Sequence, residues 1–114
     1  MSKDNLVFIK HIMDNIKLLE EFSISLSKEE LSNDLLKQYA IIRAIEVIGE
    51  ASKNIRSNFK SQHPEIDWKD IIGTRDKIIH HYFGINLDVV WEIIKIDLPE
   101  LKNKIEKILS AESK

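Results

Sequence analysis

Apolar residues recur at helical spacing along almost the whole chain, and few residues interrupt the pattern. The 114 residues include 3 Gly and 2 Pro, and no alternating β-branched run is bounded by turn residues. Apolar side chains at i, i+3, i+4 and i+7 gather on one face of a helix, whereas half-buried strands need strict alternation. The sequence therefore predicts an all-α protein, and its length suits a single domain over residues 1–114 with one hydrophobic core.

Two long amphipathic helices are expected in the first half of the chain. The first runs from about Asp4 to Phe22, and the second from about Asn33 to Phe59. Between them, Ser27 followed three residues later by Glu30 resembles a capping box. The apolar arc of the second helix is broad, as in a central bundle helix. The residues expected to face the core are Leu6, Ile9, Ile12, Met13, Ile16, Leu19, Phe22, Leu36, Ala40, Ile41, Ala44, Ile45, Val47, Ile48, Ala51 and Ile55.

The second half is expected to supply the remaining helices of an up-and-down bundle of four to five helices. Asp67 is a candidate N-cap for a helix from about Trp68 to Tyr82, which Gly84 would end. Asn86 can cap the next helix. Asp97 is a plausible cap for the last helix, with Pro99 in its first turn, and a break or kink is expected there. The last helix presents Leu98, Leu101, Ile105, Ile108 and Leu109 to the core. His63, in a polar loop before Pro64, is interpreted as solvated.

Charge and composition exclude several classes of protein. A net charge of -2 argues against a basic surface that coats nucleic acid, so any contact with RNA should be local. The chain has 0 Cys, which leaves no thiolate for a metal or a disulfide. No apolar run is long enough to span a bilayer, and the first residues lead directly into an amphipathic pattern. A soluble, cytoplasmic protein with no membrane partner is expected.

The segment from Gly73 to Gly84 concentrates the chemically active side chains. On a single helix, Arg75 would interrupt a core-facing stripe, so it must be paired or must line a cleft or an interface. At ~100° per residue, Tyr82 lies on nearly the same side as Arg75, while His80 points roughly 140° away. Either the last turn loosens, or the arginine reaches round, or two copies of the helix face each other in a symmetric dimer. Adjacent residues diverge too far for His80 and His81 to share a metal, and no metal site is expected.

A polar wedge on the second long helix has two interpretations. It contains Tyr39, Arg43, Glu46 and Glu50. One interpretation is an exposed face on which Arg43 pairs with Glu46. The other is that a carboxylate of this wedge receives Arg75 or shapes a catalytic cleft.

The order of residues in the Gly73–Gly84 segment resembles the signature of the HEPN domain in its HepT-like toxin branch. Arg75, Asp76, His80 and Tyr82 match that signature position by position. Three further stretches look like the same branch in the expected order, and the resemblance extends from about Asn33 onward. These stretches are 43–51, 64–68, and 86–91 followed by Leu98 and Pro99.

The resemblance implies an all-helical, metal-independent endoribonuclease toxin without a cofactor. Its partners would be an RNA substrate, a second copy of the chain, and a nucleotidyltransferase antitoxin that inactivates it by transferring AMP to Tyr82. Arg75 and His80 would be catalytic. Asp76 would support them or would simply be solvated, and Glu46 and Glu50 are further supporting candidates. The alternative is a noncatalytic helical module that binds and regulates a nucleotidyltransferase or serves as its substrate.

The chemistry of RNA cleavage agrees with these assignments. Without a metal, the reaction needs a base for the 2'-hydroxyl proton, an acid for the leaving 5'-oxygen and a cation for the phosphorane. Imidazole titrates near neutral pH, and a guanidinium grips phosphate oxygens with a permanent charge. One copy supplies one such histidine, so the need for two proton transfers is a second reason to expect a symmetric dimer.

Overall fold

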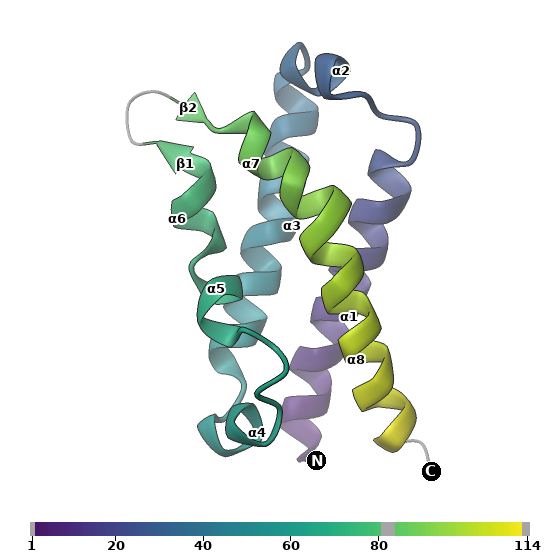
Figure 1. Ribbon diagram of the computed structural model, residues 1–114, viewed down its shortest axis with the longest axis vertical. Helices are drawn as coiled ribbons and strands as arrows, with labels where there is room; N and C mark the ends of the chain where they lie inside the picture. The colour runs from purple at the N-terminus through teal and green to yellow at the C-terminus, as the bar shows by residue number, and fades with distance from the viewer. Residues whose placement is uncertain (1, 81–83, 113–114) are drawn as a thin grey trace.

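Two long helices, α1 (Lys3–Ser23) and α3 (Leu35–Asn54), pack against each other over the most extensive helix interface of the structure. A third rod crosses them and consists of α7 (Leu87–Glu92), the π-helical segment η1 (Ile93–Asp97) and α8 (Leu98–Glu112). This computed structural model describes residues 2–80 and 84–112, and Figure 1 shows the third rod running diagonally in front of the other two. The two short helices α2 (Lys28–Ser32) and α4 (Ser57–Gln62) lie at opposite ends of the bundle (Figure 1).

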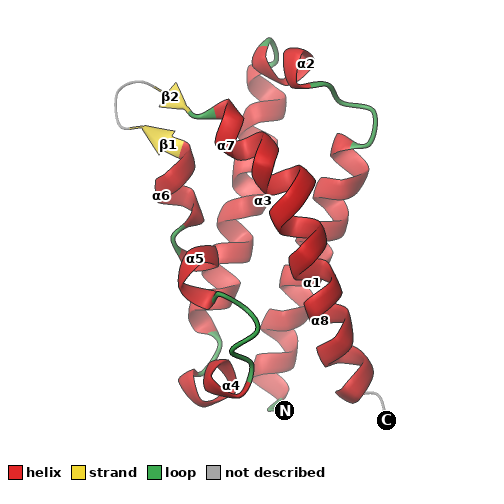
Figure 2. Ribbon diagram, viewed as in Figure 1, coloured by secondary structure: helices red, strands yellow, loops and turns green. Residues whose placement is uncertain are grey.

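The remaining elements run along α3 as a fourth layer. They are α5 (Trp68–Ile72), α6 (Thr74–Ile78) and the short strands β1 (Ile79–His80) and β2 (Gly84–Ile85), which pair antiparallel. Each strand has 2 residues, so the fold is the expected all-α bundle, and Figure 2 shows how little of it is strand. Within the described residues, no helix combines the length and the apolar character needed to cross a bilayer.

The core is made of the apolar stripes of the three long rods. Ile9, Ile12, Ile16, Ile41, Ile45, Ile48 and Ile105 are among its buried members. Three residues expected in the core are exposed instead: Leu36 is 80% exposed, Phe22 is 39% exposed, and Ala40 is also exposed. Leu36 lies in the first turn of α3 and Phe22 in the last turn of α1, so both are close to the end of their helix. Helical period alone does not reveal where a covering element ends.

The second long helix ends earlier than its period predicts. α3 stops at Asn54, and Ile55 is extended, with φ -69° and ψ 139°. The cause is a tertiary contact, because the backbone N–H of Arg56 donates to Oδ1 of the buried Asn5 over 3.1 Å. Phe59 therefore lies on the separate helix α4.

Two local expectations are corrected in the second half of the chain. His63 is not simply solvated, because its ring lies 4.6 Å from that of Phe59 and its Nδ1 is 3.0 Å from Glu65 Oε1. The break expected near Pro99 is a π-helical stretch, η1, that continues directly into α8. Proline has no N–H for the carbonyl four residues earlier, and a wider turn accommodates the missing bond without ending the helix.

Candidate functional site

The segment that carries the candidate catalytic residues begins with a capped helix. Asp67 accepts the backbone N–H of Asp70 over 3.0 Å, which confirms it as the N-cap of α5. The single helix expected from Trp68 to Tyr82 is wrong, because the chain turns at Gly73 and restarts as α6. The N–H of Gly73 donates to the carbonyl of Lys69, and the Thr74 hydroxyl donates to the carbonyl of Asp70 over 2.9 Å.

The second helix of this segment ends before the histidine. Ile79 is extended, with φ -101° and ψ 117°, and His80 follows it in β1. The β1–β2 pairing is closed by the N–H of Asn86, which donates to the Ile78 carbonyl over 2.7 Å. Two successive β-branched residues favour this change from helix to strand. Of the alternatives left open by the sequence, the backbone therefore takes the one in which the helix loosens before Gly84.

The guanidinium of Arg75 lies at the surface of the bundle. Its Nε is 3.7 Å from Glu46 Oε2 on α3, and its side chain is 56% exposed, against 28% for Glu46. Arg75 therefore does not face the core, although its spacing from the apolar residues places it on a core-facing stripe. On the short helix α6, Arg75 points to solvent while Ile78 is buried. Glu46 contacts Arg75 of α6 and not Arg43 of its own helix. Of the two interpretations of the polar wedge, the structure therefore agrees with the one in which a carboxylate of the wedge receives Arg75.

The other predicted site residues are placed as follows. The exposed Asp76 carboxylate makes no hydrogen bond or ion pair with any described residue, Arg75 included. Glu50 lies with Arg43 and His11 in a groove between α1 and α3, apart from the Arg75–Glu46 pair. His80 is placed by its backbone in β1, and its side chain is not described. Tyr82 lies outside the described residues.

A glycine on α3 brings the two halves of the Arg75–Glu46 pair together. A Cβ atom at Gly49 would lie 3.4 Å from the carbonyl oxygen of Ile71 and 3.6 Å from that of Ile72. The backbones of α3 and α5 are therefore in close contact just before Arg75. Sequence reasoning did not single out Gly49. The available signal was a glycine inside a strongly helical pattern, which costs ~1 kcal/mol relative to alanine unless packing requires it.

Replacing Gly49 by leucine is expected to lower the free energy of unfolding by about 1–3 kcal/mol, because the larger side chain must push α5 away from α3. Gly49→Ala should be tolerated, since its methyl group would make an ordinary contact at 3.4 Å. Ala40→Leu, at an exposed position of the same helix, is the matched control. Chemical denaturation measures the loss, and amide chemical shifts of α5 and α6 report the displacement. Equal stability of Gly49→Leu and Ala40→Leu would contradict the close approach.

The arrangement defines a class of protein, an all-α bundle of the HEPN type with an exposed arginine five residues before a histidine. The arginine is paired with a glutamate of the central helix. Within the described residues, no His, Cys, Asp and Glu side chains form a group of three or more that could hold a metal ion. Comparison with known proteins gives the family. The profile of the family described as Ribonuclease HepT-like matches residues 12–108, and the chain belongs to that family.

Similar proteins carry names that agree with this family. A probable ribonuclease HepT of Thermococcus cleftensis is 44% identical over 108 residues, covering 95% of this chain and 98% of the relative. A putative RNase of Caldanaerobacter subterraneus is 38% identical over 105 residues, covering 92% and 94% of the two chains. A gamma-glutamylcyclotransferase and putative RNase of Methanocaldococcus jannaschii is 38% identical over 109 residues, which are 96% of this chain but 49% of that relative. No solved structure matches this chain significantly. The family and these names support a ribonuclease-type function.

Proposed function

We propose that this protein is a metal-independent endoribonuclease that cleaves RNA with Arg75 and His80. The observation that carries the proposal is the position of Arg75, which is more than half exposed and held against α3 by Glu46. An exposed pair of this kind contributes only about 0–1 kcal/mol to stability, so its value to the fold is small. A guanidinium that remains accessible beside a carboxylate is free to grip a phosphate oxygen through its other N–H groups.

The proposed reaction is an internal transesterification of RNA. A histidine takes the proton of the 2'-hydroxyl, the 2'-oxygen bonds to phosphorus, and the bond from phosphorus to the 5'-oxygen breaks as that oxygen receives a proton. Arg75 stabilises the additional negative charge on the phosphorane oxygens. The products are a 2',3'-cyclic phosphate, which water can open to a 3'-phosphate, and a 5'-hydroxyl. Glu46 is proposed to orient Arg75, while Asp76 and Glu50 are proposed to support the site more remotely.

The active form is proposed to be a homodimer with the two copies of the Arg75 and His80 segment near its two-fold axis. Two histidines would then be available for the two proton transfers. Exposed apolar side chains at the start of α3 support an interface, since Leu35 is 59% exposed, Leu36 80% and Tyr39 59%. Monomeric proteins seldom leave such neighbouring side chains uncovered without a use for them.

The partner is proposed to be a nucleotidyltransferase antitoxin in the cytoplasm. The two proteins would form a toxin–antitoxin pair in which AMP transfer to Tyr82 stops RNA cleavage. Membership of the HepT-like family and the tyrosine two residues after His80 support this part of the proposal.

Purified protein, freed of any partner, is expected to cut single-stranded RNA with equal rates in magnesium and in excess chelator. The products should carry cyclic phosphate or 3'-phosphate ends, which mass spectrometry of a short oligonucleotide identifies. Light scattering of the active sample should give the mass of a dimer, and a monomer that cleaves at micromolar concentration would contradict the shared site. RNA that stays intact over long incubation, with tight binding to the nucleotidyltransferase, would favour the noncatalytic module instead.

A further inference from the structure

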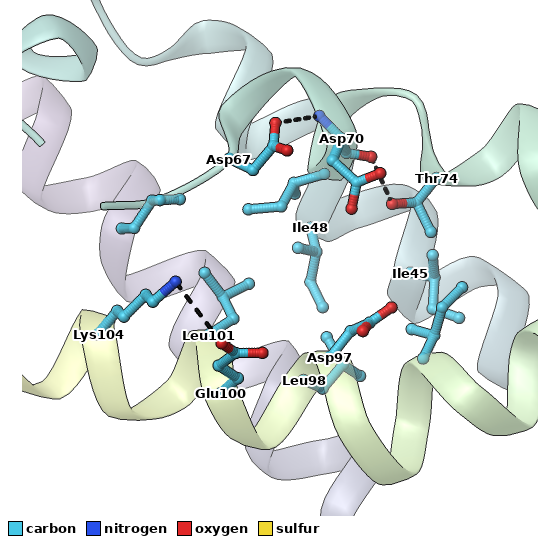
Figure 3. Close-up of a pocket in the computed structure, with 13 residues that line it drawn as sticks. Ile45, Ile48, Asp67, Asp70, Thr74, Asp97, Leu98, Glu100, Leu101 and Lys104 are labelled. Carbon is cyan, nitrogen blue, oxygen red and sulfur yellow. Dashed lines mark hydrogen bonds and ion pairs between the residues drawn. The ribbon is translucent and has the colours of Figure 1, made fainter. Parts of the chain in front are cut away.

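A cavity of about 120 Å³ lies where α5, α3 and the η1–α8 junction meet. Apolar side chains form much of its wall, Ile45, Ile48 and Leu101 among them, and the ammonium-bearing Lys104 also lines it. Its lining also includes four acidic side chains, in two pairs. Figure 3 shows Asp67 and Asp70 on the α5 side and Asp97 and Glu100 on the α8 side, with Ile48 between them.

The two pairs of carboxylates are only partly neutralised by the chain itself. Asp70 forms an ion pair with Lys77, and Glu100 lies 3.9 Å from the ammonium of Lys104. Asp67 accepts a backbone N–H but forms no ion pair with a described residue. Asp97 forms neither a hydrogen bond nor an ion pair among the described residues. One carboxylate that forms no ion pair with a described residue therefore remains on each side of the cavity.

We propose that this cavity binds a short, linear aliphatic diamine, with its methylene chain against the apolar wall and its two ammonium groups at Asp67 and Asp97. The volume sets the size of the ligand. Pockets for drug-sized ligands and cofactors measure roughly 300–1,000 Å³, whereas an engineered cavity of ~150 Å³ holds a single benzene. A lysine or arginine side chain from a protein partner would bring one positive charge, but the cavity presents unpaired carboxylates on two opposite sides. The diamine supplies both charges, and this binding does not depend on the proposed ribonuclease activity.

The electrostatics of Asp97 support a cationic ligand. Burial raises the pKa of the Asp97 carboxyl, the nearby Glu92 and Glu100 raise that pKa further, and Lys77 lowers it. A raised pKa means that the folded protein binds this proton more tightly than the unfolded chain, so ionisation of Asp97 costs stability as the pH rises through the folded-state pKa. Asp67, Asp70 and Lys104 also border the cavity. A bound ammonium group would remove the cost by stabilising the ionised carboxylate.

A ligand in this cavity would contact residues that are adjacent in sequence to the Arg75–Glu46 pair. Its lining includes Thr74, which precedes Arg75, and Ile45, which precedes Glu46. A ligand that ties α5 to the η1–α8 junction would therefore hold the backbone on both sides of the Arg75–Glu46 pair.

Titration of the isotope-labelled protein with putrescine or cadaverine, followed by two-dimensional NMR, tests the proposal. We expect saturable shifts confined to the amides of α5, η1 and the start of α8, and a fall in the pKa of Asp97 on binding. Asp97→Asn and Asp67→Asn should each weaken binding roughly tenfold or more, as expected for losing a charge-assisted contact. Asparagine keeps the N-cap at position 67. Asp97→Asn should at the same time raise stability at neutral pH, so weaker binding cannot be attributed to unfolding.

Three controls distinguish a diamine site from general attraction of cations. Asp14→Asn removes an exposed carboxylate on α1 and should leave the affinity unchanged. Butylamine, with the same hydrocarbon chain as putrescine and one charge fewer, should bind more weakly. Magnesium at matched ionic strength should not reproduce the shifts. Equal shifts with magnesium, equal affinity for butylamine, or wild-type affinity in both cavity variants would each overturn the proposal. A capped lysine peptide, which brings one ammonium group, should also bind more weakly than the diamines, and tighter binding of that peptide would overturn the proposal as well.

Discussion

Arg75→Ala is expected to slow RNA cleavage by roughly 10²–10³-fold, the usual cost of removing one group that stabilises charge in a transition state. His80→Ala should slow it by roughly 10²–10⁴-fold, since a positioned general acid or base contributes that much. Both variants should keep the helical circular dichroism signal of the wild-type protein. Gel assays of a labelled oligonucleotide measure the two rates, and a pH–rate profile should lose one limb in His80→Ala.

Matched variants separate the loss of chemistry from the loss of a charge. Arg56→Ala removes an arginine that, like Arg75, is exposed and lies 3.7 Å from a carboxylate, here that of Asp4, and it should leave cleavage unchanged. His81→Ala should matter much less than His80→Ala. Equal losses at the two histidines would mean that the wrong imidazole has been assigned, and full activity of Arg75→Ala would remove the arginine from the mechanism.

The surface position of Arg75 also changes what its replacement does to stability. A guanidinium on a core-facing stripe would be costly to bury, and its removal would raise stability. The structure places the side chain in solvent with Glu46 at 3.7 Å, so Arg75→Ala should change the free energy of unfolding by no more than about 0.5 kcal/mol.

Features of the fold that depend on neighbouring residues in sequence could be predicted. The caps at Ser27, Asp67 and Asn86 are confirmed, with N–H to side-chain oxygen distances of 3.0, 3.0 and 3.2 Å. Most of the stripe of α1 and most of that of α3 face the core as their period predicts. Each of these features needs only the local chain and one apolar face.

Features that depend on distant residues could not be predicted. The end of α3 is set by Asn5, which is 51 positions from the Arg56 amide that it binds. The close approach of α5 to Gly49 and the pairing of β1 with β2 likewise join segments whose proximity no helical period reveals. The order of residues in the sequence is therefore enough to nominate the motif residues, whereas their predicted geometry is wrong because the helix ends at Ile78.

Tyr82→Phe is expected to abolish inhibition by the nucleotidyltransferase without reducing RNA cleavage. The phenol oxygen would attack the α-phosphate of ATP, forming a bond from oxygen to phosphorus as pyrophosphate leaves and the phenol proton passes to water or a base. Incubation with the partner, ATP and magnesium should add at least one AMP to the wild-type protein, as intact-protein mass spectrometry detects, and cleavage should fall in proportion. Phenylalanine offers no oxygen for the transfer, so neither change should occur.

RNA cleavage would be inhibited because the attached AMP places negative charge and bulk near Arg75. A nucleotide attached seven residues after Arg75 in sequence carries an anionic phosphate, and that phosphate would compete with RNA for the guanidinium. The chain has 2 tyrosines, and Tyr39 on α3 is 59% exposed, which makes Tyr39→Phe the matched control. Tyr39→Phe should still gain mass and lose activity. Inhibition of Tyr82→Phe by the partner with no gain in mass would mean that the antitoxin acts by binding alone, and a gain that disappears in Tyr39→Phe would move the modification to α3.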